Sequence, residues 1–222
     1  MKRWLVFLVL LLVFTAPVHN AAAHDQFPPE WRGQWNTLFA HWYDFDDVVP
    51  GPPDQYFPDD WYSIPGGLDT PYLVTNGTIS EGTVILDDQE SISLDLDNFD
   101  DLNPLKEGRL QITFLDDPAQ ASVNPWDRLA VDIFPDPDTA SASISQFDYS
   151  EDDDWITLAW DFAIVPNPLS EVILIQSQVD NLVIDQIVVD TICSAIPVPT
   201  GAWLLGSGII GLVGLRRRLW RP

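Results

Sequence analysis

The sequence predicts an all-β protein built as a single antiparallel β-sandwich of jelly-roll-like form, with a terminal apolar segment on each side. Three observations support this fold class. Apolar and polar residues alternate with period two in many short runs between residues 24 and 195, as expected for half-buried strands. Turn-forming pairs such as Asn76-Gly77 and Asn103-Pro104 separate the runs. The chain also has 46% hydrophobic and 12% aromatic residues, which is enough to form a core.

Nine runs of the central region are expected to form strands. They are residues 39–45, 72–75, 83–86, 91–96, 109–115, 128–134, 142–149, 156–164 and 172–191. The last run should contain two strands divided at 178–181, because its two apolar stretches are continuous and typical of strands covered on both faces. Residues 46–70 are rich in Pro, Asp and Gly and predict one long loop.

The N-terminal segment, residues 1–23, has the pattern of a secretory signal peptide. Met1-Lys2-Arg3 is basic, Leu5–Phe14 is apolar throughout, and Ala21-Ala22-Ala23 provides small residues for signal peptidase. Ten apolar residues are too few to cross about 30 Å of hydrocarbon. We therefore expect cleavage before His24 and export of residues 24–195 as one domain.

The C-terminal segment, residues 196–222, has the pattern of a short membrane anchor. Residues 196–215 carry no charge, and an arginine cluster follows them. Ala202–Leu215 would form about 21 Å of helix, which is short for a transmembrane helix. Because clustered arginines are retained on the cytoplasmic side, the preceding domain should lie outside the cytoplasm.

Several residues of this segment together resemble the PEP-CTERM sorting signal, whose parts are a Pro-x-Pro motif, a short transmembrane helix and a basic end. They are Pro197, Val198, Pro199, Trp203, Gly206, Ser207, Gly208, Arg216, Arg217 and Arg218. Val198 stands where the family usually has Glu. The resemblance implies a Gram-negative bacterial host that makes exopolysaccharide, processing by an exosortase, and delivery to the cell surface or extracellular matrix.

The charge of the chain excludes one class of partner and suggests a metal. There are 34 Asp and Glu against 10 Lys and Arg, so the clustered cations needed to bind nucleic acid are missing. Ca²⁺ prefers several carboxylate and carbonyl oxygens. Its candidate ligands are Asp95, Asp97, Asp100 and Asp101. The alternative is a solvated acidic surface that maintains solubility.

Aromatic residues gather near the start of the exported domain and suggest a carbohydrate ligand. The candidate ligand-binding residues are Trp31, Trp35, Trp42, Trp61 and Tyr62. Exposed rings stack on sugars, whereas buried rings fill cores, and both interpretations stay open here. Residues 182–190 resemble the final strand of carbohydrate-binding jelly rolls, which often end in an Ile-Asp-Asx-Ile/Val pattern.

The sequence offers little that indicates an enzyme. Apart from His24, the exported domain contains only His41, so a histidine-dependent triad or a multi-histidine metal site is hard to build. We therefore expect a non-enzymatic glycan- or matrix-binding protein. The alternatives are a glycoside hydrolase that uses two carboxylates and a Ca²⁺-binding structural matrix protein. Cys193 is the only cysteine and could act in an intermolecular disulfide or as a small apolar residue.

Overall fold

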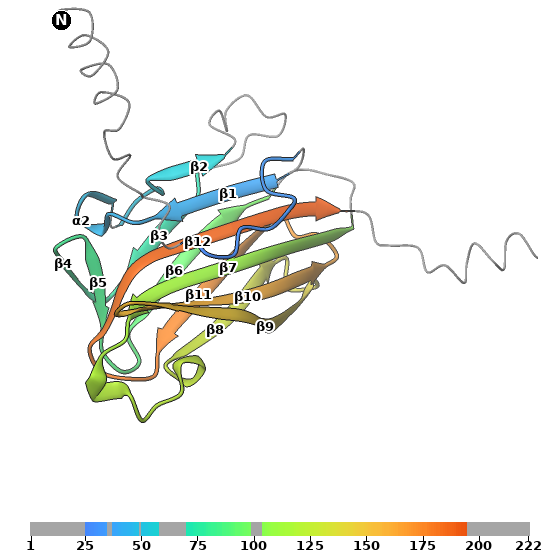
Figure 1. Cartoon of the computed structure of the whole chain (residues 1–222). Coiled ribbons are helices and arrows are strands. Elements are labelled where there is room, and N and C mark those ends of the chain that lie inside the picture. Colours follow the sequence, from blue (N-terminus) through green and yellow to red (C-terminus); the bar gives the residue numbers. More distant parts are fainter. Residues whose placement is uncertain (1–24, 35–36, 49, 58–69, 99–103, 195–222) are drawn as a thin grey trace, which may run out of the picture.

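The computed structural model describes residues 25–34, 37–48, 50–57, 70–98 and 104–194. Within these ranges the chain forms two antiparallel sheets, a short helix, α2 (Phe45–Val48), and two 3-10 turns at Pro118–Gln120 and Pro125–Asp127 (Figure 1). The predicted all-β antiparallel sandwich is confirmed. The expected signal peptide and transmembrane helix lie outside the described residues.

The larger sheet has eight strands. Six follow one another in space: β2 (Gln55–Phe57), β1 (Thr37–Trp42), β12 (Leu182–Ser194), β7 (Leu105–Leu115), β10 (Trp155–Val165) and β9 (Ser141–Asp152). The other two, β4 (Thr78–Ser80) and β5 (Thr83–Leu86), form a hairpin that joins the sheet through β12. One edge of β12 is shared, with β5 along 182–184 and β1 along 187–192, while β7 takes the other edge.

The smaller sheet has four strands, in the order β3 (Tyr72–Thr75), β6 (Ser91–Asp97), β11 (Ser170–Ser177) and β8 (Leu129–Asp136). All of its pairings are antiparallel. Side chains of successive residues in each strand point alternately into the sandwich and outward, so β11 reads as a strict alternation of half-buried and buried positions.

The strand predictions are confirmed closely for β3 and β5, and the run 172–191 divides into β11 and β12 as expected. The single-loop prediction for 46–70 is wrong in part, because most of α2 and all of β2 lie within it. The three residues of β2 form a strand only because the edge of β1 offers backbone partners. Likewise, β7 begins at Leu105 rather than at 109, since Lys106 and Gly108 interrupt the apolar pattern without interrupting the pairing.

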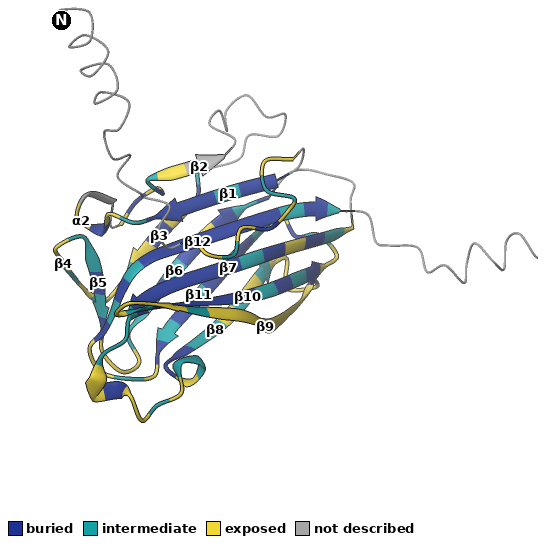
Figure 2. Ribbon diagram, viewed as in Figure 1, coloured by how far each residue is buried: buried dark blue, intermediate teal, exposed yellow. Residues whose placement is uncertain are grey.

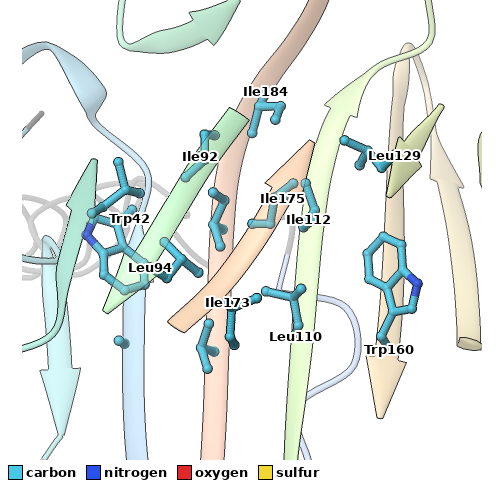
Figure 3. Packing of buried hydrophobic residues seen from close by; sticks show 14 of the residues in the cluster. Trp42, Ile92, Leu94, Leu110, Ile112, Leu129, Trp160, Ile173, Ile175 and Ile184 are labelled. Atoms are coloured by element: carbon cyan, nitrogen blue, oxygen red, sulfur yellow. The ribbon is translucent and has the colours of Figure 1, made fainter. Parts of the chain in front are cut away.

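Buried residues run along β1, β12, β7 and β10 of the larger sheet (Figure 2). Apolar side chains from the two inner faces form one core between the sheets (Figure 3). Leu94 and Ile173 come from the smaller sheet, and Leu110 and Ile112 from the larger, and all four are 0% exposed. Fully burying such a side chain contributes about 1.5–3 kcal/mol. At one end of the core, Trp160 packs edge-to-face on a neighbouring Trp ring with centroids 5.2 Å apart.

Gly108 on β7 allows an aromatic ring to lie directly over the strand. It is paired with Phe162 of β10, and a Cβ atom at Gly108 would come within 2.1 Å of the Phe162 ring. Phe162 is only 3% exposed, and one side of its ring lies against the backbone of Gly108. A side chain at Gly108 would therefore displace a core ring.

Replacing Gly108 with Ala should destabilise the protein by about 1–3 kcal/mol, the usual cost of overpacking a core. Denaturant unfolding measures this loss. Phe162→Leu removes the ring, so the double variant Gly108→Ala/Phe162→Leu should lose less than the sum of the two single losses. If the stability losses of the two single variants add up to that of the double variant, the Phe162 ring does not determine which side chains fit at residue 108.

Candidate functional site

The aromatic residues suggested as ligand-binding by the sequence fall into different environments. Trp42 is 0% exposed in the core, so the prediction that it presents a ring to a ligand is wrong. It lies on β1, where its side chain points between the sheets (Figure 3). Trp31 is half-buried in the segment before β1. Trp35, Trp61 and Tyr62 lie outside the described residues.

The suggested calcium ligands are only partly placed. Asp95 is exposed and Asp97 half-buried, both on β6, and residues two apart on a strand share a face. Asp100 and Asp101 lie outside the described residues. Among the residues that are described, no group of three or more His, Cys, Asp or Glu is placed to hold a metal ion. The calcium site stays a prediction.

The sorting-signal residues, from Pro197 to Arg218, also lie outside the described part of the chain. In that part, no helix is long and apolar enough to cross a membrane. Cys193, close to the end of β12, is buried at 4% exposure. Its thiol donates a hydrogen bond to the side-chain amide oxygen of Asn98, Oδ1, at 3.1 Å. A thiol in this position is shielded from a second chain, which favours the packing interpretation over an intermolecular disulfide.

Each of the four cations between residues 24 and 195 forms an ion pair. The pairs are Arg32 with Asp25 and Asp190, Lys106 with Glu171, Arg109 with Asp161, and Arg128 with Asp116. Arg128 also donates to two backbone carbonyls of the loop between β7 and β8. Positive charge in this domain is therefore used inside the fold, and the surface is left strongly acidic.

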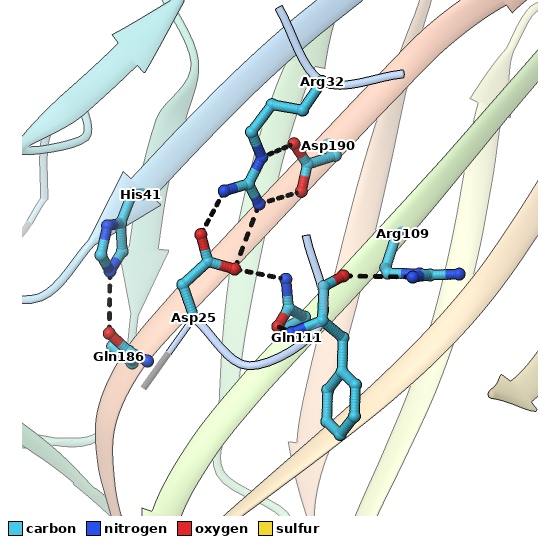
Figure 4. A network of polar contacts seen from close by, with 8 residues as sticks. Asp25, Arg32, His41, Arg109, Gln111, Gln186 and Asp190 are labelled. Carbon is cyan, nitrogen blue, oxygen red and sulfur yellow. Dashed lines mark hydrogen bonds and ion pairs between the residues drawn. The ribbon is translucent and has the colours of Figure 1, made fainter. Parts of the chain in front are cut away.

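Residues 25–34, here called the N-terminal strap, lie across the outer face of the larger sheet (Figure 4). Arg32 donates to both carboxylate oxygens of Asp190 on β12, at 2.5 and 2.6 Å. It also pairs with Asp25, which accepts from the Gln111 amide of β7 at 2.8 Å. The guanidinium group thus joins the two ends of the strap to the centre of the sheet.

Two backbone contacts complete the attachment of the strap. The Phe27 N–H donates to Gln111 at 2.8 Å, and the Phe27 carbonyl accepts from Arg109 at 3.1 Å. Arg109 lies 3.6 Å over the ring of Phe147 on β9, and Phe27 packs edge-to-face on the same ring. The strap is therefore held by polar contacts over β12 and β7 and by aromatic contacts over β9.

Burial and hydrogen bonding both shift the pKa values of the Arg32–Asp190 ion pair. Burial raises the pKa of Asp190 to about 6, against the opposing pull of Arg32. Burial also opposes the charge on Arg32, but its hydrogen bonds to Asp190 and Asp25 outweigh this effect and raise its pKa. The Asp190 side chain is 0% exposed, so no substrate reaches it. The Asp25 and Asp190 carboxylates both hold the strap on the sheet.

A row of buried polar side chains crosses four strands beside the strap, and Figure 4 shows its first pair, His41 and Gln186. His41 Nε2 donates to the Gln186 carbonyl oxygen at 2.8 Å, and the Gln186 amide donates to Thr113 at 3.1 Å. Thr113 then shares a 2.8 Å hydrogen bond with Thr157. All four are at most 3% exposed. Burial lowers the pKa of His41, so the neutral ring is the stable partner in this row.

The outer face of the smaller sheet is, by contrast, open. We call it the open face and define it by two cross-strand rows. The rows are Tyr72–Asp95–Val172–Phe134 and Val74–Ser93–Leu174–Asp132. Tyr72 is 43% exposed and Phe134 54%. They stand on the two edge strands, about 14 Å apart because neighbouring strands are separated by about 4.8 Å.

The open face combines exposed rings with polar groups between them. Asp95 is exposed, Asp132 is also exposed, and Ser93 lies beside Asp95's row. Sequence reasoning missed Tyr72 and Phe134 because each stands alone in its segment. A usable signal existed, since each is a large aromatic residue at the polar-facing position of an alternating strand.

The neutral state of His41 predicts a pH dependence of stability. Below the ordinary pKa of 6.5, the unfolded chain binds a proton that the folded His41 resists. The contribution of neutral His41 to the free energy of unfolding is therefore full above pH 6.5. It is lost as the pH falls through the folded pKa, and the free energy of unfolding then decreases by up to about 1.4 kcal/mol per pH unit. Urea unfolding above and below pH 6.5 measures this, with His41→Gln as the control. Parallel profiles for the two proteins would contradict the assignment.

The two outer faces thus differ in what they leave for a ligand. The larger sheet has its polar groups paired with one another and with the strap, whereas the smaller sheet exposes rings and carboxylates. Comparison of the chain with protein-family models, with curated proteins and with solved structures gave no match. Its function is therefore inferred from these surfaces and from the terminal segments.

Proposed function

We propose that this protein is an exported, non-enzymatic β-sandwich that binds a matrix exopolysaccharide through its open face. The observation that carries the proposal is the placement of Tyr72 and Phe134, two exposed rings on opposite edge strands with Asp95 between them in one row. A flat array of rings separated by hydrogen-bonding groups suits an extended chain of sugars.

The chemistry of recognition follows from the two kinds of side chain. An aromatic ring gains contact area against the C–H face of a sugar with little loss of side-chain freedom. Carboxylates such as Asp95 and Asp132 accept hydrogen bonds from sugar hydroxyls, and these are charge-assisted. Because both rings stand on paired strands, the surface is held in place before the ligand binds, which reduces the entropy cost.

The charge of the domain limits the ligand further. Residues 24–195 hold all 34 acids and four cations, and each cation is paired within the fold. An anionic polysaccharide would be repelled over the whole surface unless cations screened it. A neutral exopolysaccharide is therefore the favoured ligand.

We also assign the sandwich to the jelly-roll type on the basis of its strand order. The sequence β1–β12–β7–β10 in one sheet and β6–β11–β8 in the other makes β6, β7 and β8 alternate between sheets, as β10, β11 and β12 do. This interleaving supports the proposed assignment, because a jelly roll wraps two Greek keys into a pair of packed sheets. The stretch 182–190, which resembles the closing strand of carbohydrate-binding jelly rolls, lies in β12.

The terminal segments supply the proposed route to the cell surface. Signal peptidase would remove residues 1–23, the helix at 202–215 would retain the chain in the membrane, and an exosortase would act near Pro197–Pro199. The last strand ends at Ser194, immediately before this motif, so the proposed processing falls beyond the folded domain. The destination is the cell surface or extracellular matrix.

Replacing either ring of the open face should weaken binding. Tyr72→Ala and Phe134→Ala are each expected to reduce affinity for the host's neutral exopolysaccharide about tenfold, which corresponds to about 1.4 kcal/mol. Affinity electrophoresis in polysaccharide gels measures the change. Tyr149→Ala is the matched control, because Tyr149 is a 50% exposed ring on β9 of the other sheet.

The same assay separates the competing functions. If the polysaccharide gel slows Tyr72→Ala, Phe134→Ala and Tyr149→Ala equally, the open face is not the binding surface. Release of reducing sugar ends by the wild-type protein would indicate a hydrolase. A calcium-dependent rise in melting temperature without any polysaccharide binding would indicate the structural calcium protein.

The sorting proposal predicts a difference between two host strains. In a host with its exosortase, the recovered protein should lack residues from the region of Pro197–Pro199 onward, whereas a strain without the enzyme should retain them in the membrane fraction. Intact mass after cell fractionation measures the outcome. An intact C-terminus in both strains would mean that 202–215 is an ordinary membrane anchor.

A further inference from the structure

One ion pair lies inside the sandwich and connects the two sheets. Lys106 is on β7 of the larger sheet and Glu171 is on β11 of the smaller. Both side chains are 0% exposed. The Lys106 Nζ atom is 2.5 Å from one carboxylate oxygen of Glu171 and 2.7 Å from the other. The other ion pairs among the described residues each have at least one partially exposed partner.

Three buried cross-strand neighbours of the pair are apolar, and the buried Asn98 amide contacts one of them, Cys193. On the larger sheet, the cross-strand partners of Lys106 are Ile164 and Cys193, which are 0% and 4% exposed. On the smaller sheet, Glu171 is paired with Leu96, which is 0% exposed. Residues paired across strands lie on the same face, so these three side chains border the ammonium and carboxylate groups.

As two ions, this pair is incompletely satisfied. Only one contact has hydrogen-bond geometry, and the Glu171 Oε1 atom has no hydrogen-bond partner. A buried ion pair repays its desolvation only when further hydrogen bonds satisfy both groups. Burial raises the pKa of Glu171 against the opposing pull of Lys106, and nearby Asp97 and Asp95 add to the rise. The site therefore favours a proton on the Glu171 carboxyl group more than an exposed position would.

We propose that Lys106 and Glu171 condense to an intramolecular isopeptide bond that joins β7 to β11. The Lys106 ammonium first transfers a proton to the Glu171 carboxylate, which gives an amine and a carboxylic acid. The Nζ lone pair then attacks the carboxyl carbon. An N–C bond forms, the C–OH bond breaks, and one water molecule leaves with the hydroxyl group and one amine proton. No oxidant, reductant or activating group is consumed.

Geometry and environment both favour this reaction. Since both carboxylate oxygens are at hydrogen-bond distance from Nζ, the carbon between them lies within the roughly 3–3.5 Å of a near-attack arrangement. For attack, the carboxyl group must turn so that Nζ faces its carbon from above the carboxyl plane. The product replaces two desolvated ions with one neutral amide, which removes the cost of burying charge. Loss of water from an apolar interior to solvent also opposes the reverse reaction.

The bond would lock the sandwich covalently. Lys106 and Glu171 are 65 positions apart in the chain, so the crosslink would close a long loop that includes β8, β9 and β10. Crosslinks of long loops stabilise a fold mainly by restricting the unfolded chain. Because the chain has a single cysteine, it cannot form an intramolecular disulfide, whereas an amide is a crosslink that it can form. The inference is independent of what the open face binds.

The proposal is tested by peptide mapping of the full-length chain, purified from its expression host, denatured and digested. Tandem mass spectrometry should find a peptide containing Lys106 joined to a peptide containing Glu171, with the summed mass less one water, in most molecules. Lys106→Arg is the matched control, because arginine keeps the cation and the ion pair but its guanidinium does not condense. Lys106→Met removes both the charge and the nucleophile.

The wild-type map decides the proposal without any variant, so failure of a variant to fold leaves the test intact. Separate, unmodified peptides containing Lys106 and Glu171 in fully folded wild-type protein would overturn it. A crosslink that forms with loss of ammonia, between Lys106 and an asparagine such as Asn98, would overturn the assignment of Glu171. A linked species in both Lys106 variants would show that another residue is the nucleophile.

Discussion

The structure depends most on strand β12 and its pairing along both edges. Its 13 residues, Leu182–Ser194, hydrogen bond to β7 on one side and to β5 and then β1 on the other. Inward side chains such as Ile187 and Val189 join the core, and outward ones such as Gln186 and Asp190 hold the polar row and the strap. The strand is rich in β-branched apolar residues, as expected for a strand covered on both faces, and Gln186 and Asp190 are polar residues that the outer face uses.

Scarcity of positive charge shapes the rest of the domain. Arg32 attaches the strap to β12, and Lys106 connects the two sheets. Arg109 contacts Phe27 and Phe147. Arg128 donates hydrogen bonds to the loop after β7. Arg32, Lys106 and Arg109 each join segments far apart in the chain, whereas the side-chain hydrogen bonds of Arg128 are within the preceding loop. The remaining carboxylates keep the surface soluble and set a negative field, which any ligand of the open face must tolerate.

The two outer faces of the sandwich differ in how far they are covered. On the larger sheet the strap covers β12 and β7, and buried hydrogen bonds satisfy its polar groups. Such networks add specificity and rigidity rather than access, because an unpaired polar group there would be costly. On the smaller sheet, by contrast, the rings of Tyr72 and Phe134 and the side chains of Asp95 and Asp132 are exposed to solvent. This contrast is why the open face, rather than the polar network, is the proposed binding surface.

The sequence alone determined the fold class, most strand positions and the proposed processing of both termini. These depend on local patterns: alternation with period two, turn residues, and uncharged apolar runs beside basic residues. Even short strands such as Thr83–Leu86 were predictable, because their alternation is bounded by turns. Trp42 was ambiguous, since a ring can fill a core or stack on a ligand, and local sequence does not say which face of β1 is covered.

Only the tertiary structure decided which distant residues meet. Tyr72 and Phe134 belong to one surface because β3 and β8 are the edges of one sheet, and Lys106 meets Glu171 because two sheets pack face to face. Their separations along the chain carry no local signal. Strand order is set by packing of the whole core, so contacts that depend on that order appear only once every strand has been placed.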